Sequence, residues 1–170
     1  MESAAIRTYL RPSGHGLKLH LGCGDYWFEG YVNIDIEVYG GTDMCWNLLE
    51  RLPFQDKTVE IIESYEVIEH VDQDEAKNMI DDWYRLLIDG GKVRISTPDM
   101  DALVSQYEAN KEKTIEFMFG FTGYQKHKWI YTAETLKKLF EDKGFKQVVV
   151  TKGFLDERPN EPKLILEATK

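Results

Sequence analysis

The 170-residue chain is poor in cysteine, lacks long apolar runs and carries fewer basic than acidic side chains. Its two cysteines, Cys23 and Cys45, are too few for a disulfide scaffold or a four-thiolate zinc site. This favours a reducing, cytoplasmic location. No stretch approaches the roughly 20 apolar residues that span a bilayer, and residues 1–7 lack the charged-then-apolar order of a signal peptide. We therefore expect no membrane partner.

The shortage of basic charge restricts the possible partners further. The chain has 21 lysines and arginines against 30 acidic residues, a formal net charge of −9. Proteins that bind nucleic acid rely on basic side chains that displace counterions from phosphates. The one modest cluster of lysines, between residues 126 and 138, is typical of a solvated face. The sequence therefore argues against a nucleic-acid partner.

What is present is the composition of one globular domain, with 42% hydrophobic and 30% charged residues. The length fits one domain, and no repeat or low-complexity linker divides it. We expect a single domain over residues 1–170. Residues 1–16 read as an N-terminal arm, because they show no hydrophobic periodicity and contain Pro12, Gly14 and Gly16.

Hydrophobic patterning predicts strands that alternate with helices in the middle of the chain. The predicted strands cover residues 18–21, 31–36, 42–46, 59–65, 92–97, 145–151 and 164–168. The last two have no helix between them and should form a hairpin joined through Pro159 and Pro162. This order predicts an α/β fold with a mostly parallel central sheet and an antiparallel C-terminal edge hairpin.

Two amphipathic helices are predicted from their capping signals. Asp72 and Glu75 form a capping box at the start of the first, whose apolar stripe runs to Leu87 before Gly90-Gly91 ends it. Thr132 caps the second, which should end at Gly144. A shorter helix is expected over residues 101–109, followed by a polar break at 110–113.

The first two strands enclose the stretch most suggestive of a ligand site. Gly22 and Gly24 flank Cys23 directly after the first strand, and the second strand ends on Asp35. In doubly wound folds, nucleotide cofactors bind at the carboxyl ends of the strands, and such an acid binds ribose hydroxyls. Only six residues separate Gly24 from Tyr31, fewer than a normal crossover helix needs.

Five segments taken together resemble the class I S-adenosylmethionine-dependent methyltransferases, over about residues 17–168. In order they are Leu19–Gly24, Ile34-Asp35, Asn47 with Leu52–Asp56, Ser64–His70 and Leu87–Val93. The resemblance implies the Rossmann-like sandwich of that family and S-adenosylmethionine as cofactor. The chain departs from the family in lacking a third glycine and a full first helix. Such short links resemble a subgroup of small, type 11-like methyltransferases associated with glycans or secondary metabolites.

The same resemblance implies which residues contact the cofactor. Asp35 would accept both ribose hydroxyls, and Asn47 would accept a hydrogen bond from the adenine amine, with Asp43 as the alternative. The full set of expected contact residues is Leu21, Gly22, Cys23, Gly24, Asp35, Ile36, Asn47, Leu48, Tyr65 and Glu66.

Two histidines are the candidates for catalysis. His127 precedes the helix capped by Thr132, where this family often closes over its acceptor, and His70 ends the segment after the fourth strand. The alternative for His127 is a structural loop histidine. The aromatic residues between Phe117 and Tyr131 could line an acceptor pocket or belong to the core.

A metal is the open question at this site. Glu66, Glu69 and His70 would share one face of a helical turn. Their pattern resembles the metal-binding segment of the quinone-biosynthesis O-methyltransferases and of the enzymes that methylate the terminal ribose of small RNAs. The latter use a later histidine, which His127 would match. In many members without metal, however, the Glu-His pair serves the cofactor pocket. We therefore expect no metal, with a divalent ion on these four residues as the alternative.

The expected function is methyl transfer from S-adenosylmethionine to an oxygen or nitrogen atom of a small-molecule, glycan or metabolite acceptor. Two alternatives remain open. One is a non-catalytic module that binds S-adenosylmethionine, since 170 residues leave little room for a substrate domain. The other is a nicotinamide-dependent oxidoreductase, against which the missing third glycine counts.

Overall fold

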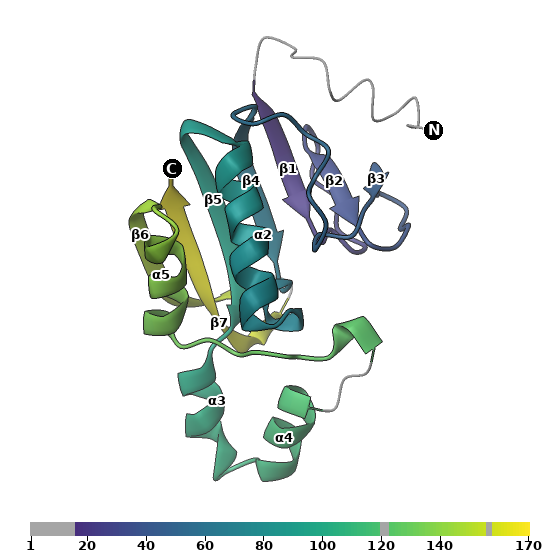
Figure 1. Cartoon of the computed structure of the whole chain (residues 1–170). Helices are drawn as coiled ribbons and strands as arrows, with labels where there is room; N and C mark the ends of the chain where they lie inside the picture. The colour runs from purple at the N-terminus through teal and green to yellow at the C-terminus, as the bar shows by residue number, and fades with distance from the viewer. Residues whose placement is uncertain (1–15, 120–122, 156–157) are drawn as a thin grey trace.

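The computed structural model describes residues 16–119, 123–155 and 158–170, so the predicted arm at 1–16 lies outside them except for Gly16. The described chain forms a seven-stranded sheet in the order β3-β2-β1-β4-β5-β7-β6 (Figure 1). Strands β1 to β5 are parallel, while β7 pairs antiparallel with both β5 and β6. The predicted α/β fold with an antiparallel C-terminal hairpin is confirmed. The strands are β1 Leu17–Leu21, β2 Val32–Asp35, β3 Met44–Cys45, β4 Val59–Tyr65, β5 Leu87–Pro98, β6 Lys146–Leu155 and β7 Arg158–Thr169.

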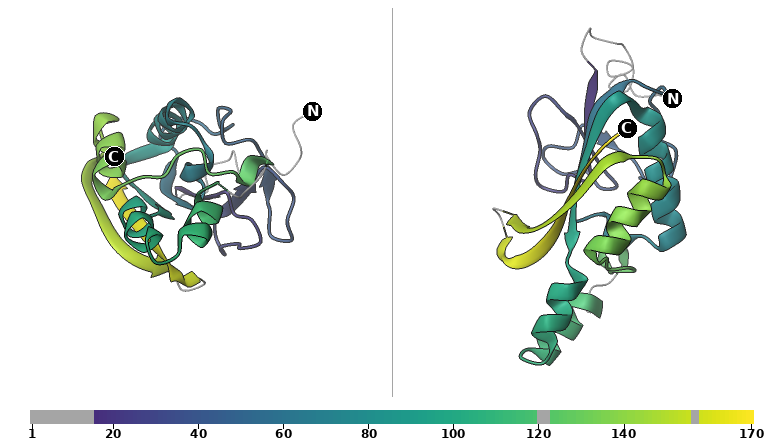
Figure 2. Two further views of the ribbon diagram at one scale, coloured as in Figure 1. Left: turned by 90° about the horizontal axis from the view of Figure 1, so that it is seen from below. Right: turned by 90° about the vertical axis from the view of Figure 1, so that its left-hand side faces the viewer.

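Helices α2 and α5 cover one face of the sheet (Figure 2, right). Helix α2 (Gln73–Leu86) begins at the predicted capping box of Asp72 and Glu75. Helix α5 (Ala133–Asp142) is capped by Thr132, also as predicted. Both bury one apolar stripe in the core, including Trp83 of α2 and Phe140 of α5, each 0% exposed. Two further helices, α3 (Met100–Tyr107) and α4 (Lys111–Phe119), project beyond the carboxyl edge of the sheet (Figures 1 and 2).

Helix α2 ends earlier than its glycines indicated. Leu87 leaves helical geometry at ψ 138° and starts β5 directly. The chain entering β4 supplies donors for the last helical carbonyls, because Lys57 and Thr58 donate their N–H groups to Arg85 and Leu86. Gly90-Gly91 is therefore not a helix stop. It lies within β5, where Gly90 donates its N–H to the Lys170 carbonyl and the Gly91 carbonyl accepts the N–H of Lys170.

Other boundaries differ from the predicted ones in similar ways. The polar segment 110–113, predicted to be non-helical, instead contains the start of α4. The Asn110 carbonyl accepts the N–H of Thr114 at 2.9 Å. Strand β3 contains only two residues and is shorter than the predicted strand over 42–46. Strands β6 and β7 extend toward each other, so Pro159 and Pro162 lie inside β7 rather than in a connection.

The link from β1 to β2 contains no helix, as its length required. Instead the ring of Phe28 stacks on His20, with centroids 4.1 Å apart and planes 6° from parallel. His20 is 2% exposed, and burial lowers the pKa of its imidazole. Its Nδ1 lies 3.1 Å from the Asn33 side-chain oxygen. Among the described residues, no helix lies on this face of the sheet (Figure 2), so these side chains shield β1 where a helix would otherwise do so.

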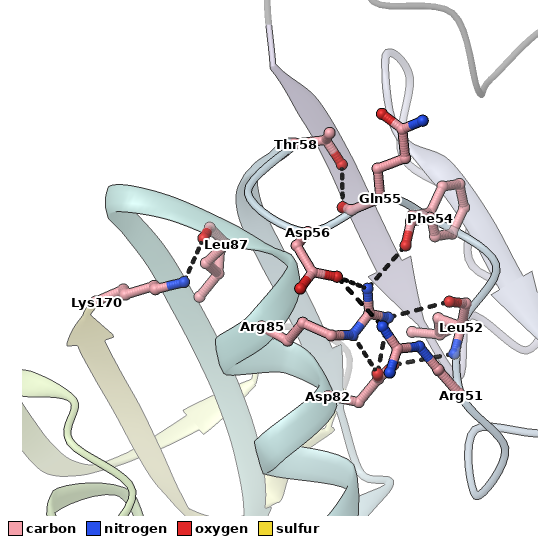
Figure 3. Close-up of polar contacts among 10 residues, drawn as sticks. All are labelled: Arg51, Leu52, Phe54, Gln55, Asp56, Thr58, Asp82, Arg85, Leu87 and Lys170. Carbon is pink, nitrogen blue, oxygen red and sulfur yellow. Dashed lines mark hydrogen bonds and ion pairs between the residues drawn. The ribbon is translucent and has the colours of Figure 1, made fainter.

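The connection from β3 to β4 is fixed to helix α2 by one arginine (Figure 3). Arg85 donates to the carbonyls of Phe54 at 2.8 Å and Leu52 at 3.1 Å. Its guanidinium also pairs with Asp56 and Asp82, both at 2.7 Å. The planar guanidinium presents several N–H donors in fixed directions, so it can bind these four groups at once better than a lysine ammonium could. The side chain therefore positions the segment that follows Asn47 and Leu48.

We expect Arg85→Met to lower the free energy of unfolding by about 2–3 kcal/mol, because two carbonyls and Asp82 lose a charged donor. Arg51→Met is the matched control. Arg51 makes a single 3.3 Å pair with Asp56 and its side chain is 71% exposed, so its loss should cost less than about 0.5 kcal/mol. Urea unfolding of the two variants measures the difference. Equal losses would contradict the anchoring role of Arg85.

Candidate functional site

The turn after β1 is pinned to β2 by backbone hydrogen bonds. Gly22 and Cys23 both donate to the carbonyl of Ile34, at 2.8 and 3.1 Å. Gly24 donates its N–H to the Asp35 carboxylate at 2.8 Å. The φ angles of Gly22 and Gly24 are 70° and 51°, in the left-handed region that favours glycine. The predicted glycine turn and the predicted acid are therefore brought together.

The two glycines face different surroundings. A Cβ atom on Gly22 would lie 2.2 Å from Cγ2 of Val67, the residue after Glu66. A Cβ atom on Gly24 would meet none of the described residues within 4 Å. Gly22 is thus required by the packing of the turn against the chain after β4, whereas the space beside Gly24 is open to a ligand.

Asp35 is a buried carboxylate, 9% exposed, at the carboxyl end of β2. One oxygen accepts from Gly24 and the other from the N–H of Glu37 at 3.1 Å. Each carboxylate oxygen can accept a second hydrogen bond. Ile36, which follows it, is 46% exposed. This arrangement can hold a pair of neighbouring hydroxyl groups beside the glycine turn.

Asn47 and Asp43 differ in the number of hydrogen bonds that their side chains already make. Asp43 accepts both the N–H and the side-chain amide of Asn33 on one oxygen, at 2.8 and 3.0 Å. Within the described ranges, the Asn47 side chain accepts one hydrogen bond, from the N–H of Leu49 at 3.1 Å in a local turn. Leu48 packs against the core. Of the two adenine-side candidates, Asn47 retains more of its hydrogen-bonding capacity, including its amide N–H groups.

The chain after β4 carries the next two predicted residues. Tyr65 donates its hydroxyl to Glu63, and burial raises its pKa. Glu66 has a φ of 58°, unusual for a residue with a side chain. Its carboxylate accepts from Ser96 at 2.8 Å and pairs with the ammonium of Lys163. Glu66 is therefore held by β5 and β7.

Lys163 is a site residue that sequence analysis missed. Its side chain is 0% exposed, and its Nζ lies 5.6 Å from the centre of the Phe117 ring. The available signal was a single lysine preceding the apolar run Leu164–Leu166. That pattern does not identify the partner, because Glu66 lies 97 residues earlier.

A second cluster assembles Glu69, His70 and His127. Glu69 and His70 belong to the short 3₁₀ helix η1 (Ile68–His70), and His127 lies between η2 (Gly123–Gln125) and α5. One potential ligand atom from each residue lies within 4.8 Å of the others. The rings of His70 and His127 are 5.1 Å apart. Sequence analysis grouped these residues with Glu66, which the structure instead places against Lys163.

Glu69 is the buried member of this cluster, at 1% exposed. Burial, with the negative charge of Glu66 as a second cause, raises the pKa of its carboxyl well above the usual value. Thr97 donates to one of its oxygens at 3.1 Å. The buried hydroxyl of Tyr131 finds no hydrogen-bond partner in the described part of the chain, and burial raises its pKa as well.

The aromatic residues between Phe117 and Tyr131, expected to line an acceptor pocket or to belong to the core, are buried to different extents. Phe117 lies edge-on to His127 with centroids 5.1 Å apart, while Tyr131 is 2% exposed and belongs to the core. Phe119 and Trp129 are 62% and 40% exposed. Phe121 and the side chain of Tyr124 lie outside the described residues.

In the described part of the chain, no helix is both long and apolar enough to cross a membrane. A family model described as a methyltransferase domain matches residues 10–150. An uncharacterized protein of Methanocaldococcus jannaschii is 24% identical over 166 residues, which is 92% of this chain and 76% of that protein.

Solved structures share the fold. A SAM-dependent methyltransferase from Archaeoglobus fulgidus superposes with a TM-score of 0.67 at 17% identity, covering 97% of this chain and 90% of that one. The 1,6-didemethyltoxoflavin-N1-methyltransferase of Burkholderia thailandensis, solved with that compound and S-adenosylhomocysteine, gives 0.63 at 14% identity, over 99% and 79% of the two chains.

Proposed function

Because the chain belongs to the methyltransferase-domain family, we propose that it transfers the methyl group of S-adenosylmethionine to an oxygen or nitrogen atom of a small-molecule or glycan acceptor. The observation that supports this best is the junction of Gly24 and Asp35. There a backbone N–H and a buried carboxylate meet beside open space. The cofactor's sulfonium supplies an activated methyl carbon.

The residues of the chain bind and orient the two reactants. The turn Leu21–Gly24 would lie along the methionine part of the cofactor, and Asp35 would accept the ribose hydroxyls with Ile36 against the sugar. Asn47 and Leu48 would contact the adenine. Tyr65, the last residue of β4, and Glu66, which follows it, would form the remaining side of the pocket. Holding the acceptor in line with the methyl carbon and excluding water are the main sources of acceleration for such a displacement.

We assign His70 and His127 to the acceptor side of this pocket. The contact of Val67 with the glycine turn joins the segment after β4 to the cofactor site, and both histidines lie just beyond it. An acceptor hydroxyl must lose its proton to become a good nucleophile. We assign the handling of that proton to these two histidines. An acceptor that is methylated on nitrogen would bind at the same position beside the two histidines.

Calorimetry with S-adenosylmethionine and S-adenosylhomocysteine tests the assignment. We expect micromolar affinity, about −8 kcal/mol. Asp35→Asn should weaken binding by about 1.5–3 kcal/mol, the range for a hydrogen bond to a charged group. Asp142→Asn, which changes an exposed acid at the end of α5, is the control and should leave affinity unchanged. Heat with a nicotinamide dinucleotide, and none with either methionine nucleoside, would contradict the proposal. Binding without methylation of any acceptor would leave only a binding module.

A further inference from the structure

Glu66 has an unusual backbone conformation at the point where the chain leaves β4. Its φ is 58°, in the left-handed region that residues with a Cβ atom adopt only at an energetic cost. Such a conformation persists only where the surrounding contacts enforce it, and it recurs at ligand-binding sites. The residues that hold Glu66 in place therefore indicate what this turn of the chain positions.

Two neighbouring strands of the sheet hold Glu66 in this conformation (Figure 1). On β5, the Ser96 carbonyl accepts the Glu66 N–H at 3.0 Å, and the Ser96 hydroxyl donates to one carboxylate oxygen at 2.8 Å. On β7, the ammonium of Lys163 pairs with the other oxygen. Ser96 and the side chain of Lys163 are both 0% exposed. Because water is excluded, these charge-assisted contacts are strong and fix the direction of the carboxylate.

The turn at Glu66 directs the next residue against the candidate cofactor site. Val67 occupies the space beside Gly22, since a Cβ atom on Gly22 would lie 2.2 Å from the Cγ2 of Val67. The turn after β1 has a second support in Ser64 of β4, whose hydroxyl donates to the Leu21 carbonyl at 3.0 Å. Ser64 is fixed by the pairing of β4 with its neighbours, whereas the place of Val67 depends on the backbone of Glu66.

A contribution to stability alone does not explain why an ion pair lies here. Removing two charges from water offsets much of their attraction, and apolar side chains of similar volume often stabilise a core equally well. What the pair adds is direction, since the Lys163 ammonium and the Ser96 hydroxyl each bind a different oxygen of Glu66. The ammonium also lies 5.6 Å from the centre of the Phe117 ring. Strand β7, helix α4 and the turn after β4 therefore meet at this group.

We propose that Lys163 is a positioning residue for the cofactor. By fixing the Glu66 carboxylate, it keeps Val67 against Gly22 and sets the shape of the turn assigned to the methionine part of S-adenosylmethionine. The Lys163 side chain is fully covered, so it acts through Glu66 and does not touch the cofactor. The inference rests on the proposed function for the identity of the ligand. It adds a residue of β7 to a site whose expected cofactor contacts all lie at or before Glu66.

Calorimetric titration of the whole chain with S-adenosylhomocysteine tests the inference, because the thioether of this ligand carries no charge that a released Glu66 carboxylate would attract. Lys163→Met should weaken binding about tenfold. Lys163→Met combined with Glu66→Gly should bind at least about threefold more tightly than Lys163→Met alone, because glycine adopts a positive φ without strain and no buried charge is left unpaired.

The control is Phe140→Leu, which changes a 0% exposed residue of α5. It should lower stability and yet bind S-adenosylhomocysteine as the wild type does. Two-dimensional NMR adds a readout that needs no ligand: the amide resonance of Gly22 should shift in Lys163→Met and stay in place in Phe140→Leu. Thermal unfolding checks that each variant is folded at the temperature of the titration. Where Lys163→Met does not fold, Ser96→Ala carries the test, because it removes the other side-chain contact of Glu66, and it should weaken binding about threefold or more.

Two outcomes would overturn the inference. One is unchanged affinity in Lys163→Met, or in Ser96→Ala where that variant is needed, which would leave a purely structural ion pair. The other is a double variant that binds no better than Lys163→Met, which would place the Glu66 carboxylate itself on the cofactor. The wild type separates the two proposals. If it binds neither methionine nucleoside, the proposed function fails, and the Gly22 resonance alone decides whether Lys163 sets the turn.

Discussion

Lys163→Met is expected to lower the free energy of unfolding by about 3–5 kcal/mol, the cost of leaving one partner of a buried ion pair uncompensated. The Lys163 side chain is 0% exposed and that of Glu66 only 13%. Methionine keeps the length of the side chain, so the change removes charge with little loss of volume. Urea unfolding at neutral pH measures the effect.

Two further variants separate the ion pair from general packing. In the background Glu66→Gln, Lys163→Met should cost clearly less, because no buried carboxylate is left alone. Lys138→Met provides the exposed comparison, since Lys138 and Asp142 are 71% and 61% exposed; it should cost less than about 1 kcal/mol. A similar loss for Lys138→Met and Lys163→Met would show that the buried pair does not stabilise the fold.

Gly22→Ala is expected to lower the free energy of unfolding by about 2–5 kcal/mol. About 1–2 kcal/mol of this comes from placing an L-residue in left-handed geometry at φ 70°. A further 1–3 kcal/mol, roughly, comes from overlap with the methyl group of Val67. Thermal or urea unfolding of the purified variant measures the sum.

Gly24→Ala is the matched control, because Gly24 has the same backbone requirement and its added Cβ atom would have no described atom within 4 Å. It should show only the first contribution to stability, while its new methyl group occupies the space assigned to S-adenosylmethionine and weakens binding. The steric contribution at Gly22 should disappear when Val67→Ala is present. Equal destabilisation by the two glycine variants, or no relief from Val67→Ala, would contradict the packing argument.

Much of the fold could be predicted because its signals are local. Alternating apolar residues marked the strands, and the Asp72–Glu75 pair marked the start of α2 to the residue. The end of α2 could not be predicted in the same way. Its last carbonyls are satisfied by Lys57 and Thr58, which lie before β4, and no pattern in the helix itself indicates a partner so distant in the sequence.

The candidate site was likewise predictable where its residues are close together in the sequence, and not where their partners are distant. Gly22, Gly24 and Asp35 lie within one short stretch, and the structure joins Gly24 to Asp35 directly. The grouping of Glu69 and His70 with His127 came from the resemblance to metal-binding subfamilies and was the alternative to a site without metal; the structure brings those three side chains together. Glu66, which that alternative also included, pairs with Lys163, and this partner could not be predicted because it comes from a strand that sequence analysis treated only as an edge.

The position of β7 between β5 and β6 has a consequence for the order of folding. Strand β6 is synthesised before β7 but lies outside it in the sheet, so β6 has no place to pair until β7 has been made. Glu66 likewise acquires its ammonium partner 97 residues after its own synthesis. Contacts this distant slow folding and leave partly folded chains exposed. The glycine turn and Asp35 can come together early on the ribosome, whereas the Glu66 carboxylate gains its ammonium partner only after the last strand has been made.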